Sequence, residues 1–161
     1  ESKKPTYIRL GKKGEPIIHN KKPKFKIGKS IVIKKGTDVA LLGVGNALSI
    51  AAESENFLSK SKISSDLISF HTIKPIDRKL LRDLFDSNKL IAVIEEHGLI
   101  GGVGSSILEW ANHNNLDTKK VMRFGGPDKF LTGCGNQKEA RKFIGLDPKK
   151  ISHQIERRLK I

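Results

Sequence analysis

Four apolar runs along this chain predict the strands of a buried sheet. They cover residues 38–45, 66–73, 90–96 and 121–124, and they are rich in β-branched and small side chains. Continuous apolar runs of this length are expected for strands that are covered on both faces. A fifth run at 30–36 also reads as a strand.

The segments between these runs have the spacing of helices. Apolar residues recur at helical intervals in 46–61 and 105–114, and Asp77 caps a helix that carries leucines on one side. Two short helices are predicted at 136–146 and 147–161. The second begins with Asp147 as its cap and Pro148 at its first position, where both residues are favoured.

Strands that alternate with helices indicate right-handed crossovers and a mainly parallel sheet between two helical layers. The link between strands 30–36 and 38–45 allows an antiparallel hairpin but is too short for a parallel crossover. We therefore predict an α/β fold of three layers (α/β/α), with a five-stranded mixed sheet, mostly parallel, and one antiparallel edge strand. Residues 1–29 are rich in Lys, Gly and Pro and read as a linker.

Length and composition narrow the classes of protein. The 161 residues fit one domain, and no apolar run approaches the roughly 20 residues of a membrane-spanning helix. The chain begins without Met or a signal peptide, so we expect a piece of a longer polypeptide. Its one cysteine, Cys134, excludes an intrachain disulfide and favours the reducing cytoplasm. No base can be placed beside Cys134, which favours a loop residue over a nucleophile.

The net charge of +14 would attract nucleic acid, acidic membranes or phosphorylated metabolites. The clearest basic cluster, residues 21–35, has one aromatic residue and no arginine. Nucleic-acid modules usually mix arginine and stacking aromatics with their lysines, so this cluster does not favour nucleic acid as the partner.

Two glycine clusters and one acidic cluster are the candidate binding or catalytic motifs. The stretches 43–48 and 101–106 each lack the third glycine of a dinucleotide fingerprint, which favours tight strand-to-helix turns. The amides of 101–106 open a helix, which also allows the alternative of an anion contact. Glu95, Glu96 and His97 are acid–base residue types, but consecutive residues on a strand point to opposite faces and cannot converge on one ion.

Taken in order, three phrases resemble a known family: "DVALLGVGNALSIAAES", "FHTIKPID" and "IEEHGLIGGVGSSILE". They are similar to the carboxyl-terminal domain of transketolase-type thiamine diphosphate enzymes. The ending "GGPDKFLTGCGNQKEARKFIGLDPKKISHQI" resembles the tail of that domain, and "PTYIRLGKKGEP" resembles the end of the preceding pyrimidine-binding domain and its linker. The resemblance implies a boundary between residues 1–29 and a carboxyl-terminal domain at 30–161.

The resemblance also implies which groups lie elsewhere. Family members hold Mg2+ and thiamine diphosphate with a GDG motif and a later asparagine in their first domain, and they activate the cofactor with a glutamate in the second. No GDG occurs in these residues. We therefore expect this segment to bind neither cofactor nor metal, and to have no catalytic residue of its own.

The parent reaction implied is transfer of a two-carbon ketol unit between phosphorylated sugars by a homodimer, with a structural, dimerising role for this domain. Alternatives are a deoxyxylulose phosphate synthase, a 2-oxo-acid dehydrogenase beta subunit, or a free-standing basic binding module. By the same resemblance Lys12, with Arg9 and Lys13 close by, matches a basic residue that binds the sugar phosphate. The corner formed by Glu96, His97, Gly101, Gly102 and Gly104 is expected to contact the remaining domains or a partner subunit.

Overall fold

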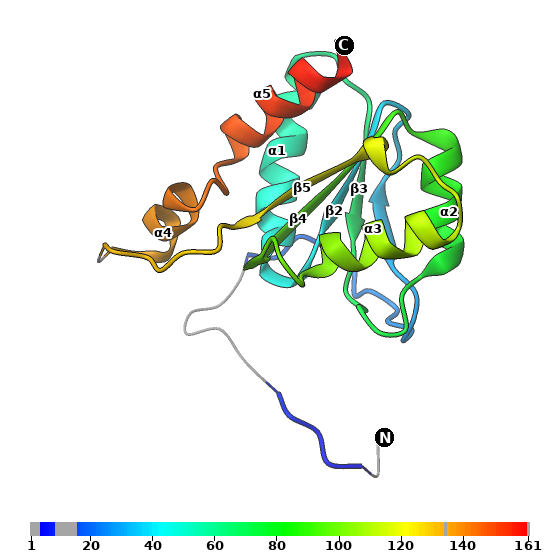
Figure 1. Ribbon diagram of the computed structural model, residues 1–161, viewed down its shortest axis with the longest axis horizontal. Helices are drawn as coiled ribbons and strands as arrows, with labels where there is room; N and C mark the ends of the chain where they lie inside the picture. The colour runs from blue at the N-terminus through cyan, green and yellow to red at the C-terminus, as the bar shows by residue number, and fades with distance from the viewer. Residues whose placement is uncertain (1–3, 9–15, 134, 161) are drawn as a thin grey trace.

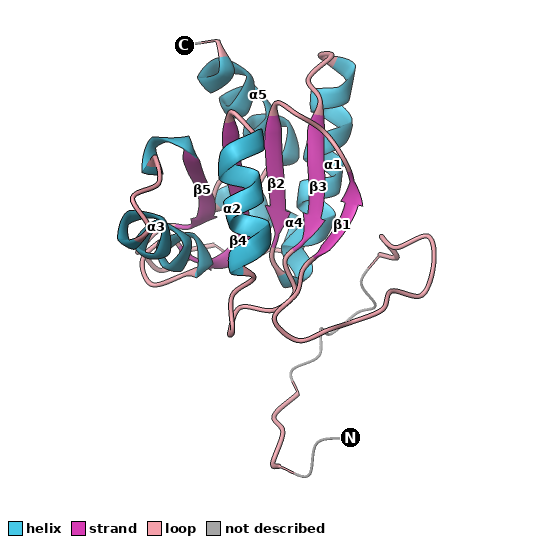
Figure 2. Cartoon of the chain, turned by 90° about the vertical axis from the view of Figure 1, so that its right-hand side faces the viewer, coloured by secondary structure: helices cyan, strands magenta, loops and turns pink. Residues whose placement is uncertain are grey.

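Five strands form one mixed sheet between two layers of helices (Figures 1 and 2). The computed structural model describes residues 4–8, 16–133 and 135–160. The strand order is β1-β3-β2-β4-β5; β1 is antiparallel to β3 and the other pairs are parallel. This confirms the predicted fold class. The strands are β1 (Ile31–Lys34), β2 (Val39–Gly43), β3 (Ser65–Ser69), β4 (Leu90–Gly98) and β5 (Val121–Gly126).

Helices cover both faces of the sheet, because successive residues of each buried strand point to opposite sides. In β2, Leu41 packs in the cluster that holds Ile151 and Ile155 of α5, whereas Leu42 packs in the cluster that holds Leu81 of α2 and Ile107 of α3. The helices are α1 (Leu48–Lys60), α2 (Arg78–Ser87), α3 (Val103–His113), α4 (Gln137–Phe143) and α5 (Pro148–Leu159), with short 3-10 turns η1 (Gly45–Ala47) and η2 (Thr118–Lys120).

The first strand is the antiparallel edge strand, but it does not form a hairpin with β2. It pairs with β3, because the link at residues 35–38 crosses the start of β3. The Gly36 N–H donates to Asp66 Oδ1 at 3.2 Å, and the Asp38 N–H donates to the Ser64 carbonyl at 2.8 Å. Four extended residues reach about 13 Å, more than the roughly 10 Å of two strand spacings. The short link therefore has room to skip one strand.

Strand β3 is shorter than the predicted run of 66–73. Ser69 is its last paired residue, opposite Gly43 at the end of β2 and Ile31 at the start of β1. The Phe70 N–H still donates to the Gly43 carbonyl at 3.0 Å, and both neighbouring strands stop at this level of the sheet. Within the described ranges no helix is long and apolar enough to cross a membrane.

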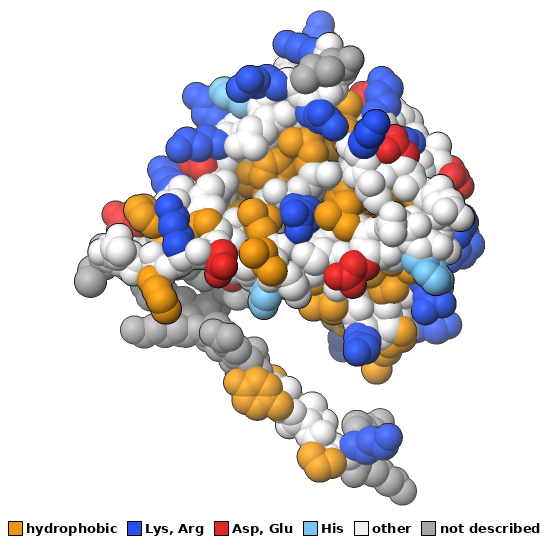
Figure 3. Space-filling model, viewed as in Figure 1, with side chains coloured by type: hydrophobic (Ala, Val, Ile, Leu, Met, Phe, Trp, Pro, Cys, Tyr) orange, Lys and Arg blue, Asp and Glu red, His pale blue; other side chains and the backbone are white. Residues whose placement is uncertain are grey.

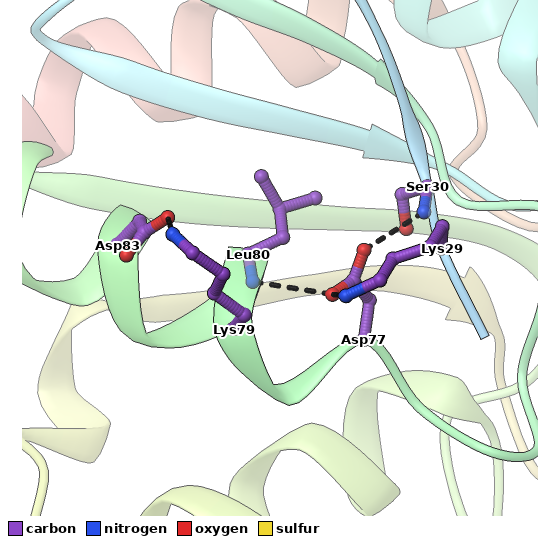
Figure 4. A network of polar contacts seen from close by, with 6 residues as sticks. All are labelled: Lys29, Ser30, Asp77, Lys79, Leu80 and Asp83. Atoms are coloured by element: carbon purple, nitrogen blue, oxygen red, sulfur yellow. Dashed lines mark hydrogen bonds and ion pairs between the residues drawn. The ribbon is translucent and has the colours of Figure 1, made fainter.

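The linker enters the domain at the edge where the parallel strands end, because β1 runs against β3 (Figure 1). The buried carboxylate of Asp77 holds this entry point (Figure 4). It accepts from the Ser30 N–H at 2.9 Å and from Lys29 Nζ at 3.5 Å, and it also caps α2 through the Leu80 N–H at 3.3 Å. Asp77 is thus both the predicted helix cap and an anchor for the linker.

Candidate functional site

Strand β4 carries the acidic cluster to its carboxyl end, where Glu95 turns inward. Its side chain is 1% exposed. Oε2 accepts from the Val103 N–H at 2.8 Å, and Oε1 accepts from the Gly104 N–H at 2.9 Å. Gly102, the cap residue of α3, has no side chain to do this. Glu95 therefore supplies the missing cap, at the helix end whose dipole favours a negative charge.

The glycines of the corner have two structural roles: one forms the turn and the others allow close packing. Gly101 has φ +72°, a conformation that side chains disfavour, and so makes the turn. Gly102 gives room to the carboxylate: a Cβ there would lie 2.6 Å from Glu95 Oε2 and 2.6 Å from the Gly98 carbonyl oxygen. At Gly104 a Cβ would lie 2.7 Å from Arg123 Cδ. The predicted steric role of these glycines is confirmed.

Glu96 and His97 make contacts that differ from those of Glu95. Glu96 Oε1 lies 2.5 Å from Arg141 Nε of α4, and the two side chains are 34% and 18% exposed. His97 is exposed, and its Nδ1 lies 3.1 Å from the Gly98 carbonyl oxygen. All three residues line one pocket at the end of the strand, but each side chain has a different hydrogen-bond partner. Glu95 is buried within the domain, so of the two carboxylates only Glu96 is accessible to a neighbour.

A pocket of about 360 Å³ lies at this corner. Its walls come from the ends of two adjacent strands, with Val44 after β2 and Glu96 and His97 on β4, and from Ile73 and Ser106. The chain leaves β2 toward β3 on one side and leaves β4 toward β5 on the other. Ligands of open α/β sheets usually bind at such a reversal of strand order. The corner is therefore the best-placed site on the sheet.

The groups at the corner do not fit a cofactor diphosphate or its metal. The Val103 and Gly104 amides, which could have met an anion, already donate to Glu95. Among the described residues there is no group of three or more His, Cys, Asp and Glu side chains that could hold a metal ion. What the corner offers is a shallow pocket with one ion pair, one exposed histidine and apolar walls.

Two groups of residues singled out in the sequence remain, the glycines at 43–48 and the basic residues near the amino terminus together with the cysteine. At Gly43 a Cβ would lie 2.6 Å from Leu48 Cα, so the first glycine cluster serves close packing rather than a nucleotide. Arg9, Lys12, Lys13 and Cys134 lie outside the described residues.

Two arginines that hold the corner were not identified from the sequence. Arg141 reaches Glu96 across 45 positions, and Arg123 Nη1 donates to the Leu99 carbonyl at 2.8 Å and to Ser105 Oγ at 3.1 Å. Single arginines in a chain this basic carry no local signal of such a role.

Relatives of this chain include a synthase and a section of a transketolase. A 1-deoxy-D-xylulose-5-phosphate synthase of Geobacillus sp. (strain WCH70) is 39% identical over 134 residues, or 83% of this chain and 21% of the synthase. A putative transketolase C-terminal section of Methanocaldococcus jannaschii is 30% identical over 162 residues, or 99% of this chain and 50% of that protein. The chain thus spans half or less of the length of these relatives.

Solved structures agree with the sequence relatives. A split gene transketolase, described as an inactive beta4 tetramer, has a TM-score of 0.81 at 25% identity and covers 91% of this chain and 47% of that one. A Pichia stipitis transketolase shares the fold with a TM-score of 0.57 at 12% identity, over 83% of this chain and 18% of that one. The family described as "Transketolase, C-terminal domain" matches residues 28–151. By its sheet, its glycine corner and this match, the chain belongs to the transketolase C-terminal domain family.

Proposed function

We propose that this chain is the carboxyl-terminal, structural part of a thiamine diphosphate- and Mg2+-dependent enzyme. The enzyme transfers a two-carbon ketol unit between phosphorylated sugars in the cytoplasm, and it works as a homodimer. One observation carries the proposal: 99% of the chain aligns with half of a putative transketolase C-terminal section at 30% identity. The likeness to the split gene transketolase supports it.

The groups that bind the cofactor belong to the other domains or to a partner subunit. The absence of a metal-ligand cluster from the described residues and the use of the corner amides by Glu95 fit this division. The match from residue 28 and the start of β1 at Ile31 support a boundary near residue 29 between linker and domain.

The second candidate is the carboxyl-terminal domain of a 1-deoxy-D-xylulose-5-phosphate synthase. The 39% identity to the Geobacillus synthase favours it. The two enzymes share cofactor and fold but differ in product. Formation of 1-deoxy-D-xylulose 5-phosphate by the whole enzyme would select this candidate over ketol transfer.

The test compares this chain with the assembled enzyme. With the remaining domains present, thiamine diphosphate and Mg2+ should support ketol transfer from a phosphorylated ketose to a phosphorylated aldose. Saturating cofactor at a hundredfold excess over Kd should stabilise the assembled enzyme by about 2.7 kcal/mol and should leave the melting of residues 1–161 unchanged. A reproducible shift for residues 1–161 alone would show that cofactor-binding groups lie within them.

Substrate phosphate is the proposed ligand of Lys12, with Arg9 and Lys13 beside it. In the assembled enzyme Lys12→Ala should raise KM for phosphorylated sugars roughly 10- to 150-fold, the equivalent of one charge-assisted hydrogen bond. An unphosphorylated ketose serves as the control substrate. Equal effects on the two substrates would remove Lys12 from the phosphate site.

The strand-end corner is the proposed contact with a neighbouring domain or subunit. Glu96 and His97 are exposed there, and two large apolar side chains stand beside them, Ile73 at 50% and Ile100 at 75% exposure. The linker enters at the same edge of the sheet. Ile100→Lys should therefore weaken assembly of the whole enzyme in sedimentation experiments and leave the melting of residues 1–161 unchanged. Unchanged assembly would place the contact elsewhere.

A further inference from the structure

A basic groove of about 320 Å³ lies between α1 and the connection from α4 to α5, away from the corner pocket. Its floor is apolar, with Ile50 and Leu146 buried and Phe57 half-buried. Figure 3 shows Lys and Arg side chains gathered over α4 and α5. Two acidic residues, Glu53 and Asp147, face four basic ones in the lining: Lys138, Arg141, Lys142 and Lys149.

The positive charge of this groove is only partly balanced. Within the described part of the chain, Lys138, Lys142 and Lys149 form no salt bridge. The carboxylate of Asp147 is engaged as the cap of α5, where it accepts from the Lys150 N–H at 3.0 Å. The groove thus presents ammonium groups above an apolar floor.

The donor of Arg141 that has no partner in the described ranges is the observation that indicates a ligand in the groove. Arg141 Nε donates to Glu96, but Nη2 is buried and has no hydrogen-bond acceptor among the described residues. A buried donor without an acceptor is unfavourable and is rare in folded proteins. The exposed side chains of Lys138 and Lys142 line the same groove, so an anion bound there against Arg141 also meets their positive charge.

We propose that this groove binds a small organic anion, a molecule with one phosphate or carboxylate group joined to an apolar portion. The anionic group lies against Arg141 and the lysines, and the apolar portion covers Phe57 and Ile50. A planar guanidinium matches either anion with two parallel hydrogen bonds. The inference does not depend on the proposed function.

The same guanidinium links the groove to the corner. Arg141 holds Glu96 at the rim of the corner pocket, so Glu96 and a bound anion share one positive charge. The contact of Glu96 with Arg141 and the binding of an anion in the groove therefore oppose each other, and such coupling acts equally in both directions. Binding in the groove loosens Glu96, and removal of the Glu96 charge strengthens binding in the groove.

Nuclear magnetic resonance titration of the ¹⁵N-labelled chain tests the site. The probes are phenyl phosphate, benzoate and inorganic phosphate, and the first two distinguish a phosphate ligand from a carboxylate ligand. Shifts should gather on the groove face of α1, on residues 138–149 and on the Arg141 Nε–H signal. At least one aromatic anion should bind about tenfold more tightly than inorganic phosphate, because its ring buries apolar surface. Equal affinity for all three probes, or shifts spread over all lysines, would overturn the proposal.

Two neighbouring lysines of α5 provide the matched variants. Lys149 lines the groove and Lys150 does not, so Lys149→Gln and Lys150→Gln change the net charge equally at nearly the same place. Lys149→Gln should weaken binding several-fold, and Arg141→Gln about tenfold or more. Lys150→Gln should change the affinity less than about twofold, because Lys150 does not line the groove and salt screens its charge across the solvent. Glu96→Gln should tighten binding. Equal effects of the two lysine variants would show attraction by net charge alone, and unchanged affinity in Glu96→Gln would remove the coupling to the corner.

Discussion

Replacement of Glu95 by glutamine tests the central feature of the corner. The carboxylate accepts two backbone hydrogen bonds, at 2.8 and 2.9 Å, from the first turn of α3. Glutamine keeps one acceptor oxygen and turns an NH2 group toward the second backbone N–H. One hydrogen bond is lost and two donors then face each other in a site that is 1% exposed.

The expected loss follows from these contacts. A hydrogen bond to a charged group contributes about 1.5–3 kcal/mol, and the interaction of a charge with the helix end contributes about 0.3–1 kcal/mol. Because a neutral side chain is less costly to bury than a carboxylate, part of this loss is offset. We expect Glu95→Gln to lower the free energy of unfolding by about 2–3 kcal/mol, or roughly 4–12 °C in Tm for a domain of this size.

The neighbouring carboxylate is the control. Glu96→Gln removes a partly exposed ion pair, and such pairs contribute about 0–1 kcal/mol. Urea unfolding of the parent and both variants gives the comparison, and hydrogen exchange at the Val103 and Gly104 amides reports the cap directly. If Glu95→Gln unfolds like Glu96→Gln and keeps those amides protected, the buried carboxylate does not hold the helix and our account of the corner is wrong.

Three further predictions concern positions around the sheet. Gly102→Ala should lower the free energy of unfolding by about 1–3 kcal/mol through overlap with Glu95, whereas Gly98→Ala, whose Cβ would find its nearest neighbours at 3.9 Å, should unfold like the parent in urea. Asp77→Ala and Asp147→Ala each remove a helix cap and should each lower the free energy of unfolding by about 1 kcal/mol. Only Asp77→Ala should also expose the Ser30 amide to rapid hydrogen exchange. Equal exchange of that amide in both variants would show that Asp77 does not anchor the linker. The side chain of Lys89, followed by the Ser64 N–H, lowers the pKa of Asp38 below its ordinary value of 3.8. Since the pKa is lower in the folded state, this stabilisation is complete above 3.8 and is lost as the pH falls through the folded value. Asp38→Asn should therefore unfold more easily than the parent at neutral pH, and the difference should shrink in acid; a difference that is constant with pH would exclude this contribution.

Local sequence determined much of the fold, because the signals involved act over a few residues. The apolar runs marked all five strands, and Asp77, Asp147 and Pro148 marked helix starts that the structure has at Arg78 and Pro148. The short link after β1 excluded a parallel crossover and so predicted an antiparallel strand at the edge. The order of the glycine and acidic phrases carried the resemblance that the family match confirms.

Tertiary structure decided which of several compatible contacts forms. The link at residues 35–38 is long enough either to form a hairpin with β2 or to pass over one strand. Its hydrogen bonds to Ser64 and Asp66 place β1 beside β3. Alternation along β4 separates Glu95 from Glu96 but does not say which one is buried; the amides of α3 decide it, because they need an acceptor that Gly102 lacks. The partner of Glu96 lies 45 positions away in α4, a distance over which no periodicity in the sequence carries information and only packing brings the charges together.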